Sequence, residues 1–211
     1  MSSPFGKDSA LMALVLAVMD GDEGLVTDLL KATPGLAKCA LLGGATREAP
    51  VDYFMKKISH YLYTGDTALH VAAAAYRPAL AARLVAEGAD VGARNRRGAQ
   101  PLHYAADGGP TLRTWNPRAQ AETIARLIEL GALPNSLDKS GVAPLHRAVR
   151  TRCAAAVKAL LEGGADPRLT NKSGSTPMDL ARLTTGRGGS GTPEARAEQE
   201  KILRLLGARN A

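Results

Sequence analysis

Four short segments that begin with glycine recur along the chain, and their spacing constrains the fold more than any other feature of the sequence. The segments begin at Gly65, Gly98, Gly141 and Gly174. These glycines are 33, 43 and 33 residues apart, and a Gly-Ala pair at Gly88, Gly131 and Gly164 recurs at matching steps of 43 and 33. In both sets of landmarks the longer step of 43 residues falls in the same repeat, which therefore contains an insertion. This agreement predicts a solenoid, in which each repeat is one structural unit that packs on its neighbours.

Each repeat also carries the signals of two helices. Thr67 and Thr176 stand where a helix N-cap belongs, and proline follows at the first-turn position in three repeats. The second helix has one apolar face, whose residues recur at three- and four-residue steps. That face comprises Leu80, Leu84, Val85, Ile124, Leu127, Ile128, Val157, Leu160 and Leu161. The glycine of each Gly-Ala pair then fits a helix C-terminus.

A 33-residue period with the motif Gly-x-Thr-Pro-Leu-His, then Ala-Ala, then an apolar pair before Gly-Ala, resembles the ankyrin repeat. The resemblance implies an all-α ankyrin-repeat solenoid of about five helix-turn-helix units, with short hairpin-like connections and degenerate terminal repeats. It also implies that His70, His103 and His146 tie neighbouring backbone segments together by hydrogen bonds.

We expect residues 1–211 to form a single domain of this kind, with insertions between and within its units. The units are an N-terminal capping repeat at 8–40, an insertion at 41–62, a repeat at 63–95, a repeat at 96–138 that contains an inserted loop at 108–118, a repeat at 139–171, and a C-terminal capping repeat at 172–211 with a Gly-rich insertion at 185–193.

The insertion at 41–62 has two interpretations. Val51, Phe54, Met55, Ile58 and Leu62 fall at helical spacing, which favours a short extra helix that packs on the first two repeats. Aromatic residues also crowd here, and they favour an exposed anchor for a partner. The Gly-rich insertion at 185–193 lacks the Gly-Lys-Ser/Thr ending of a phosphate-binding loop, so we interpret it as a linker.

The inserted loop at 108–118 carries the only tryptophan of the chain, Trp115, between Arg113 and Arg118. In ankyrin folds the turn between the two helices borders the concave groove, so a longer turn could form a finger over it. Trp115 then either packs into the core or contacts a partner, and the sequence leaves both interpretations open.

The resemblance also implies where binding occurs, because the variable positions of ankyrin repeats lie on the hairpin tips and the inner helices. Carried over to this chain, those positions form a basic stripe with one aromatic residue: Tyr63, Arg96, Arg97, Lys139, Arg150 and Lys172. Arg94 and Arg152 would extend the stripe, whereas Tyr104 and Arg147 are expected to pack between repeats. The alternative is that these charges are only solvated surface.

The charge of the chain bears on its partner. The formal net charge is +7, and residues 106–211 hold 16 Lys/Arg against 10 Asp/Glu. Such an excess favours an acidic protein, nucleic acid or an anionic surface. The stripe lacks the interleaved aromatics of single-strand binders. We therefore predict a module for protein–protein interaction, with an acidic partner favoured, and nucleic acid or an anionic surface as the alternative.

Catalysis is not expected. Three of the four histidines belong to the repeat motif, which leaves His60, and no Cys–His or His–His spacing indicates a nucleophile or a metal site. We therefore predict no enzyme activity, no cofactor and no metal. Cys39 and Cys153 lie far apart, which favours a reducing, cytoplasmic location. No apolar run is long enough to span a membrane.

Overall fold

The computed structural model describes residues 8–46, 51–113, 115–183 and 192–208. Its helices are α1 (Ser9–Asp20), α2 (Glu23–Ala32), α3 (Ala68–Ala74), α4 (Pro78–Ala86), α5 (Pro101–Ala105), α6 (Pro117–Glu129), α7 (Pro144–Thr151), α8 (Ala154–Glu162), α9 (Pro177–Arg182) and α10 (Pro193–Gly207). Two short strands, β1 (Phe54–Met55) and β2 (His60–Tyr61), pair antiparallel. Short 3-10 turns span Leu36–Lys38, Val51–Tyr53 and Lys56–Ile58.

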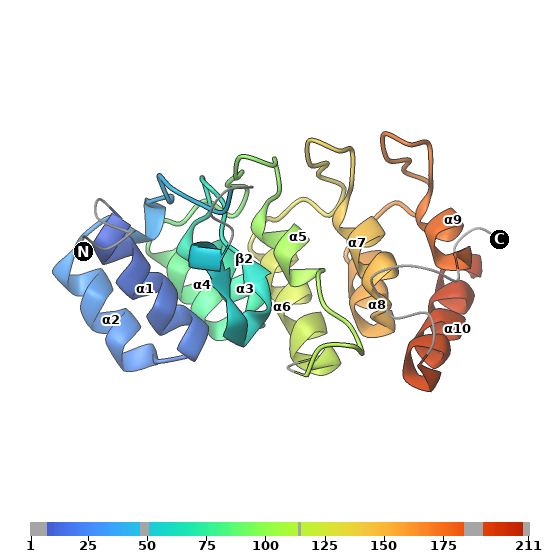
Figure 1. The fold of residues 1–211 in the computed structure, drawn as a ribbon, viewed down its shortest axis with the longest axis horizontal. Coiled ribbons are helices and arrows are strands. Elements are labelled where there is room, and N and C mark those ends of the chain that lie inside the picture. Colours follow the sequence, from blue (N-terminus) through green and yellow to red (C-terminus); the bar gives the residue numbers. More distant parts are fainter. Residues whose placement is uncertain (1–7, 47–50, 114, 184–191, 209–211) are drawn as a thin grey trace.

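The helices are arranged as five consecutive pairs, α1–α2 to α9–α10, which follow one another in a row (Figure 1). The first helices form one layer, in which α1 contacts α3, α3 contacts α5, α5 contacts α7 and α7 contacts α9. The second helices form the other layer, with contacts of α4 to α6, α6 to α8 and α8 to α10. The expected all-α solenoid of about five helix-turn-helix units is therefore confirmed.

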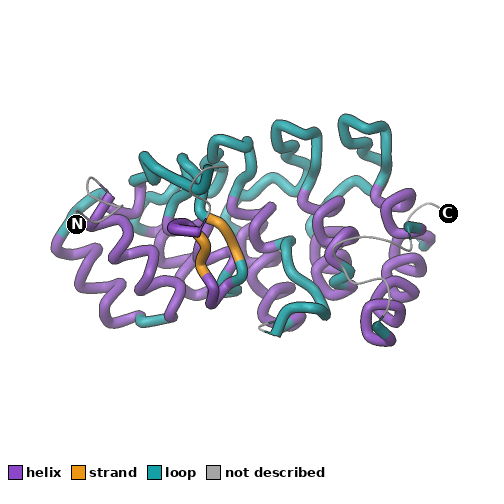
Figure 2. Tube along the Cα trace, in the orientation of Figure 1, coloured by secondary structure: helices purple, strands orange, loops and turns teal. Residues whose placement is uncertain are grey.

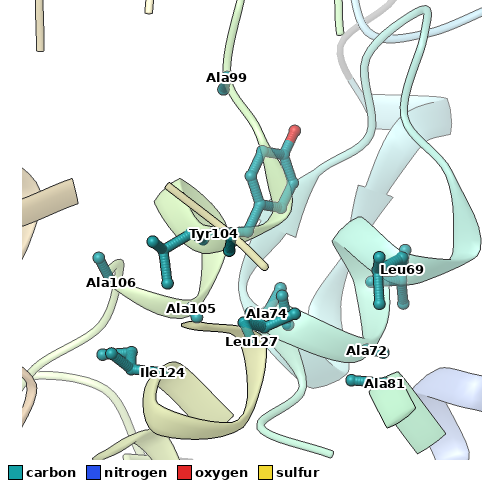
Figure 3. Packing of buried hydrophobic residues seen from close by; sticks show 14 of the residues in the cluster. Leu69, Ala72, Ala74, Ala81, Ala99, Tyr104, Ala105, Ala106, Ile124 and Leu127 are labelled. Atoms are coloured by element: carbon teal, nitrogen blue, oxygen red, sulfur yellow. The ribbon is translucent and has the colours of Figure 1, made fainter. Parts of the chain in front are cut away.

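The core lies between these two layers. Most of the apolar residues expected on the second helices are buried, among them Leu84, Ile124 and Leu160, which have no exposed surface, and Val85 and Ile128 are partly buried. Figure 3 shows how Leu69 of α3, Tyr104 of α5 and Leu127 of α6 lie in this core together with many alanines. Because alanine is small and favours helix, it lets neighbouring helices approach closely.

Each unit after the first is preceded by a loop that projects from the same edge of the row (Figure 2). We call these the tip loops, at residues 63–65, 96–98, 139–141 and 172–174. Backbone hydrogen bonds join each tip loop to the next, from Arg96 N to Thr64 O (2.8 Å), from Lys139 N to Arg97 O (2.9 Å) and from Lys172 N to Ser140 O (3.2 Å). The loops therefore form a continuous ladder.

Glycine is required at the end of each tip loop. Gly98 has a left-handed φ of 74°, which residues with a Cβ rarely adopt. A Cβ there would also lie 2.9 Å from Lys139 N of the next tip loop. All four recurring glycines thus serve the turn, and Gly65, Gly98 and Gly141 also allow the close contact with the next unit.

The histidine of the repeat motif links each unit to the next, as the resemblance implied. In α3 the backbone N–H of Thr67 donates to His70 Nδ1 (3.2 Å), and His70 Nε2 reaches Ala99 O of the next unit (3.2 Å). His103 and His146 make the same pair of contacts, with Nε2 bonded to Val142 O and Ser175 O. Nδ1 accepts a hydrogen bond in each case, so it carries no proton. The imidazole is therefore neutral, and its Nε2–H donates.

The expectation of an extra helix in the first insertion was wrong. Within the described part of this insertion, β1 and β2 form a small hairpin in which Phe54 pairs with Tyr61 and Met55 with His60. The ends of the insertion are held together, because Leu41 N donates to Asp66 O and Gly65 N donates to Leu41 O, both at 2.8 Å. A helix over residues 51–62 would move the chain about 18 Å along its axis. A hairpin returns to its starting point, and its aromatic cross-strand pair stabilises it.

The other two insertions differ in how far the structure describes them. The loop between α5 and α6 is described except for residue 114 and runs over the same side of the row as the hairpin (Figure 2). The Gly-rich insertion at 185–193 lies outside the described residues, apart from Thr192 and Pro193 at the start of α10. Among the described residues, no helix is both long and apolar enough to cross a bilayer.

Candidate functional site

A cavity of about 530 Å³ lies where the two insertions meet the first helices and the tip loops. We call this cavity the inner pocket. The face formed by the tip loops and the first helices is called the inner face. The lining of the pocket comes from the hairpin (Ile58, Ser59, His60, Tyr61), from the first two tip loops and the residues beside them (Tyr63, Asn95, Arg97, Ala99), from the first helices and their ends (Ala74, Tyr76, Tyr104, Asp107, Arg147, Arg150, Thr151) and from the inserted loop (Gly108, Gly109, Thr111, Leu112, Trp115).

A buried carboxylate organises one side of the pocket. Asp66 has no exposed surface, and its oxygens accept hydrogen bonds from Tyr104 Oη (2.7 Å), Asn95 Nδ2 (2.9 Å) and Tyr63 N (2.7 Å). Burial, with the negative charge of Asp66, raises the pKa of Tyr104 well above its ordinary value, so this hydroxyl stays protonated. The network fixes Tyr104, as expected for a residue that packs between repeats. It also holds Asn95, which precedes the tip loop at 96–98, against α5.

Arg147 joins two carboxylates at the opposite side. Its guanidinium lies 2.7 Å from Asp107 Oδ2 and 3.0 Å from Asp138 Oδ2, and all three side chains are largely buried. Burial acts to raise the pKa of Asp107, but the charges of Arg147 and Arg150 and the hydrogen bond from Arg147 outweigh it, and the pKa lies below its ordinary value. Both carboxylates are therefore ionised near neutral pH. Arg147 connects α7 to the end of α5, as its register predicted.

His60 closes the pocket from the hairpin. Its ring lies against Tyr104, with the ring centroids 4.1 Å apart. Burial lowers the pKa of His60 below its ordinary value, although Asp107 and Asp66 act in the opposite direction. His60 is thus a neutral packing residue that seats the hairpin on α5.

The inserted loop is held close to the helices by two glycines. A Cβ on Gly108 would meet Tyr76 Oη at 2.0 Å, and one on Gly109 would meet Thr151 O at 1.8 Å. The Tyr76 hydroxyl in turn donates to Asp107 O. Only glycine allows this approach, so the wall of the pocket is set by backbone packing.

Trp115 packs against the core and also lines the pocket. Its Nε1 donates to Gln120 Oε1 (3.3 Å), and Gln120 Nε2 donates to Ala105 O and Asp107 O. The two interpretations of Trp115 are therefore not exclusive: the ring is fixed by packing, and part of it faces the cavity.

Tyr63 brings together the basic residues of the first tip loops. The guanidinium carbons of Arg97 and Arg96 lie 5.0 and 5.3 Å from the centre of its ring, within cation–π distance. Arg97 also donates to Tyr63 Oη (2.9 Å), and Arg96 donates to Ala45 O. The aromatic ring and the two cations thus form one side of the pocket rim.

The structure brings some of the predicted site residues together and separates others. Tyr63, Arg97, Trp115 and Arg150 line the inner pocket, and Arg96 adjoins it. Lys139 and Lys172 are exposed on the next tip loops, and Arg113 is exposed on the inserted loop. Arg118 lies on α6 and pairs with Glu122 on the same helix (2.8 Å), away from the lining.

The expected extension of the stripe was wrong at Arg152. Arg152 is 5% exposed, adopts a left-handed φ of 60° after α7, and donates to Leu183 O. Arg94 is exposed, and its guanidinium donates to Gly98 O and Leu137 O, which joins two neighbouring units. Arg152 is therefore not part of the basic surface, whereas Arg94 lies exposed beside the tip loop at 96–98.

Sequence reasoning missed Tyr76 and Gln120, which fix the loop, and did not assign Asp66 and Asn95 to a network. Tyr76 has a left-handed φ of 53°, and nothing in its residue type signals this conformation. Among the described residues, no cluster of three His, Cys, Asp or Glu side chains could hold a metal ion.

Comparison with known protein families gives two matches. A model of the ankyrin repeat matches residues 64–96, and a model of ankyrin repeats in many copies matches residues 127–181. These segments cover two of the complete repeats and the start of the last one. No curated protein is similar enough to the chain to be counted as a relative.

Proposed function

Since this chain is an ankyrin-repeat protein, we propose that it is a non-catalytic module that binds a partner protein on its inner face, with an acidic partner favoured. Ankyrin repeats generally mediate protein–protein interaction, and proteins built from them are typically binding modules. The ladder of tip loops supports this proposal most directly. It holds exposed cations, Arg96, Lys139 and Lys172, at the same position of successive tip loops, and the exposed Arg97 lies next to Arg96.

Fold alone does not assign the partner, so the argument depends on this surface. The ladder spaces the cations regularly along one edge, and the inner pocket adjoins it at Arg97. Complementary charges across an interface speed association and select the partner. Cys39 is exposed and Cys153 is buried, both as free thiols, and we propose a reducing compartment such as the cytoplasm on that basis.

Charge reversal on the tip loops tests the proposal. The full-length protein, the double variant Lys139→Glu/Lys172→Glu and the control Lys31→Glu/Lys158→Glu are immobilised and exposed to a lysate of the source organism. All four lysines are exposed, but Lys31 and Lys158 lie on the second helices α2 and α8. We expect mass spectrometry to identify proteins that the wild type and the control retain and that the variant Lys139→Glu/Lys172→Glu loses.

Two other results would contradict the proposal. Identical protein lists from all three forms would mean that the tip loops do not bind. Retention of nucleic acid that nuclease removes and moderate salt releases would favour the alternative function, because phosphate contacts weaken steeply with salt.

A further inference from the structure

We propose that the inner pocket receives one carboxylate side chain, carried beside an apolar residue on an extended segment of the partner protein. This inference depends on the proposed function and names the chemistry that the site recognises. Neither the repeat motif nor the two family matches assigns a pocket at this position, because the non-periodic insertions build two of its walls.

The charge of the lining favours an anion. Its described residues contain three arginines, Arg97, Arg147 and Arg150, against one carboxylate, Asp107. Asp107 is bound by Arg147 at 2.7 Å. In the described part of the chain, Arg97 has no carboxylate at ion-pair distance, and its side chain contacts the neutral Tyr63. A cation at the pocket rim is therefore available to a ligand.

The shape and the other walls favour a carboxylate with an apolar neighbour. Ile58, Leu112 and the rings of Tyr61, Tyr63 and Trp115 supply apolar surface beside the arginines. A planar carboxylate can accept two parallel hydrogen bonds from one guanidinium. A phosphate carries more negative charge, and Asp107 in the same lining opposes it.

The size of the pocket and its surroundings indicate a polypeptide as the source of the carboxylate. A cavity of about 530 Å³ holds more than one side chain. Outside it, the ladder of tip loops continues from Arg97 to Lys139 and Lys172. A small free anion would contact only the pocket, whereas an extended segment that starts there can follow these cations.

A random peptide library tests the inference without knowledge of the natural partner. Peptides are selected on the full-length protein, on Arg97→Glu and on the control Arg204→Glu, which makes the same charge change on the exposed side of α10. Circular dichroism checks that each variant is folded, and Arg97→Gln repeats the test without adding a negative charge. We expect the wild type and the control to select peptides with an acidic residue beside an apolar one. Arg97→Glu should lose these peptides.

Trp115 reports whether the selected peptides occupy the pocket. It is the only tryptophan of the chain and lines the cavity. A synthetic copy of a selected peptide should change its fluorescence on binding. Replacement of the acidic residue of the peptide by its amide should weaken binding by about tenfold to a hundredfold.

The possible failures are distinguishable. Selected peptides without an acidic residue, or acidic peptides that bind equally well to Arg97→Glu or leave Trp115 fluorescence unchanged, would overturn this inference and leave the binding function standing. If neither the library nor the lysate yields any bound polypeptide, the proposed function itself fails.

Discussion

At the scale of single residues, the repeated histidine makes the stability of the fold depend on pH. His103 Nδ1 accepts the backbone N–H of Gln100, so a proton on Nδ1 would remove that hydrogen bond and place two donors face to face. Burial lowers the pKa of His103 to about 4, and the charge of Arg147 acts in the same direction, although Asp138 and Asp107 oppose it. His60, His70 and His146 also have lowered pKa values, with burial as the main cause.

We therefore predict that the protein loses stability as the pH falls from about 6.5 towards about 4. In this window the unfolded chain binds protons on its histidines and the folded chain does not, so the free energy of unfolding decreases. His103 alone accounts for about 2 kcal/mol between about pH 7 and about pH 5. Urea unfolding at both pH values measures the change.

The variant His103→Gln provides the control for that prediction, because its side chain does not titrate. It is expected to be less stable than the wild type at neutral pH, since the paired hydrogen bonds are less well made. Its loss of stability on acidification should be smaller by the contribution of His103, about 2 kcal/mol. Equal pH dependence in the two proteins would show that His103 is protonated at its ordinary pKa in the folded state.

At the scale of elements, the inserted loop between α5 and α6 is sensitive to a single methyl group. In Gly109→Ala the new Cβ would lie 1.8 Å from Thr151 O, and the backbone of either the loop or α7 must move. We expect a loss of about 1–3 kcal/mol in the free energy of unfolding. Thermal or urea unfolding would measure it.

Gly24→Ala in α2 is the matched control, because its Cβ would meet Asp22 Oδ1 at an ordinary 3.5 Å. Alanine favours helix over glycine, so this variant should gain about 0.5–1 kcal/mol. If Gly109→Ala were as stable as the wild type, the loop would not be packed on α7 as described.

The elements also differ in how far the sequence predicts them. The periodic glycines, prolines and histidines predict the helix pairs and the contacts between units, because each such residue has one local physical role. The hairpin was not predicted, since Phe54, Met55 and Ile58 fall at helical spacing and each strand is only two residues long. What decides between the two is the contact of Leu41 with Gly65 and Asp66, which is a property of the folded chain.

The candidate site was predicted in part for a related reason. The resemblance to the ankyrin repeat, applied in register, placed Tyr63, Arg97 and Arg150 on one face. The size and the lining of the pocket could not be predicted, because contacts between two non-periodic segments, near residues 58–61 and 108–115, determine them. Arg152 resembled a surface cation in the sequence, but it is 5% exposed in the structure, where it adopts a left-handed φ and donates to Leu183 O.

At the scale of the whole molecule, units contact mainly their neighbours, so damage at one end should stay local. Glu198 of α10 is 8% exposed, and its Oε2 accepts a hydrogen bond from Ala154 N at the start of α8 (2.7 Å). Glu198→Ala would leave that buried donor unpaired, at a cost of about 1–3 kcal/mol. We expect the last unit to unfold first in urea.

Two probes on the same sample would detect this local unfolding. Circular dichroism follows all helices, whereas the fluorescence of Trp115 follows the middle of the row. In Glu198→Ala the helical signal should begin to fall at lower urea than the Trp115 signal. The control Glu200→Ala, at an exposed position of α10 that pairs with Arg204, should behave as the wild type. Coincident transitions in Glu198→Ala would mean that the whole row unfolds as one unit.

The inserted loop has a further consequence, which concerns direction. Three successive tip loops present a cation at the same position, so a bound acidic segment could shift by one unit along them at little cost. The loop at 108–115 and the hairpin occur only once, and together they mark one position along the row. A segment that places a side chain there loses the contact if it shifts or turns around. The insertions would thus give a periodic scaffold a defined origin and polarity.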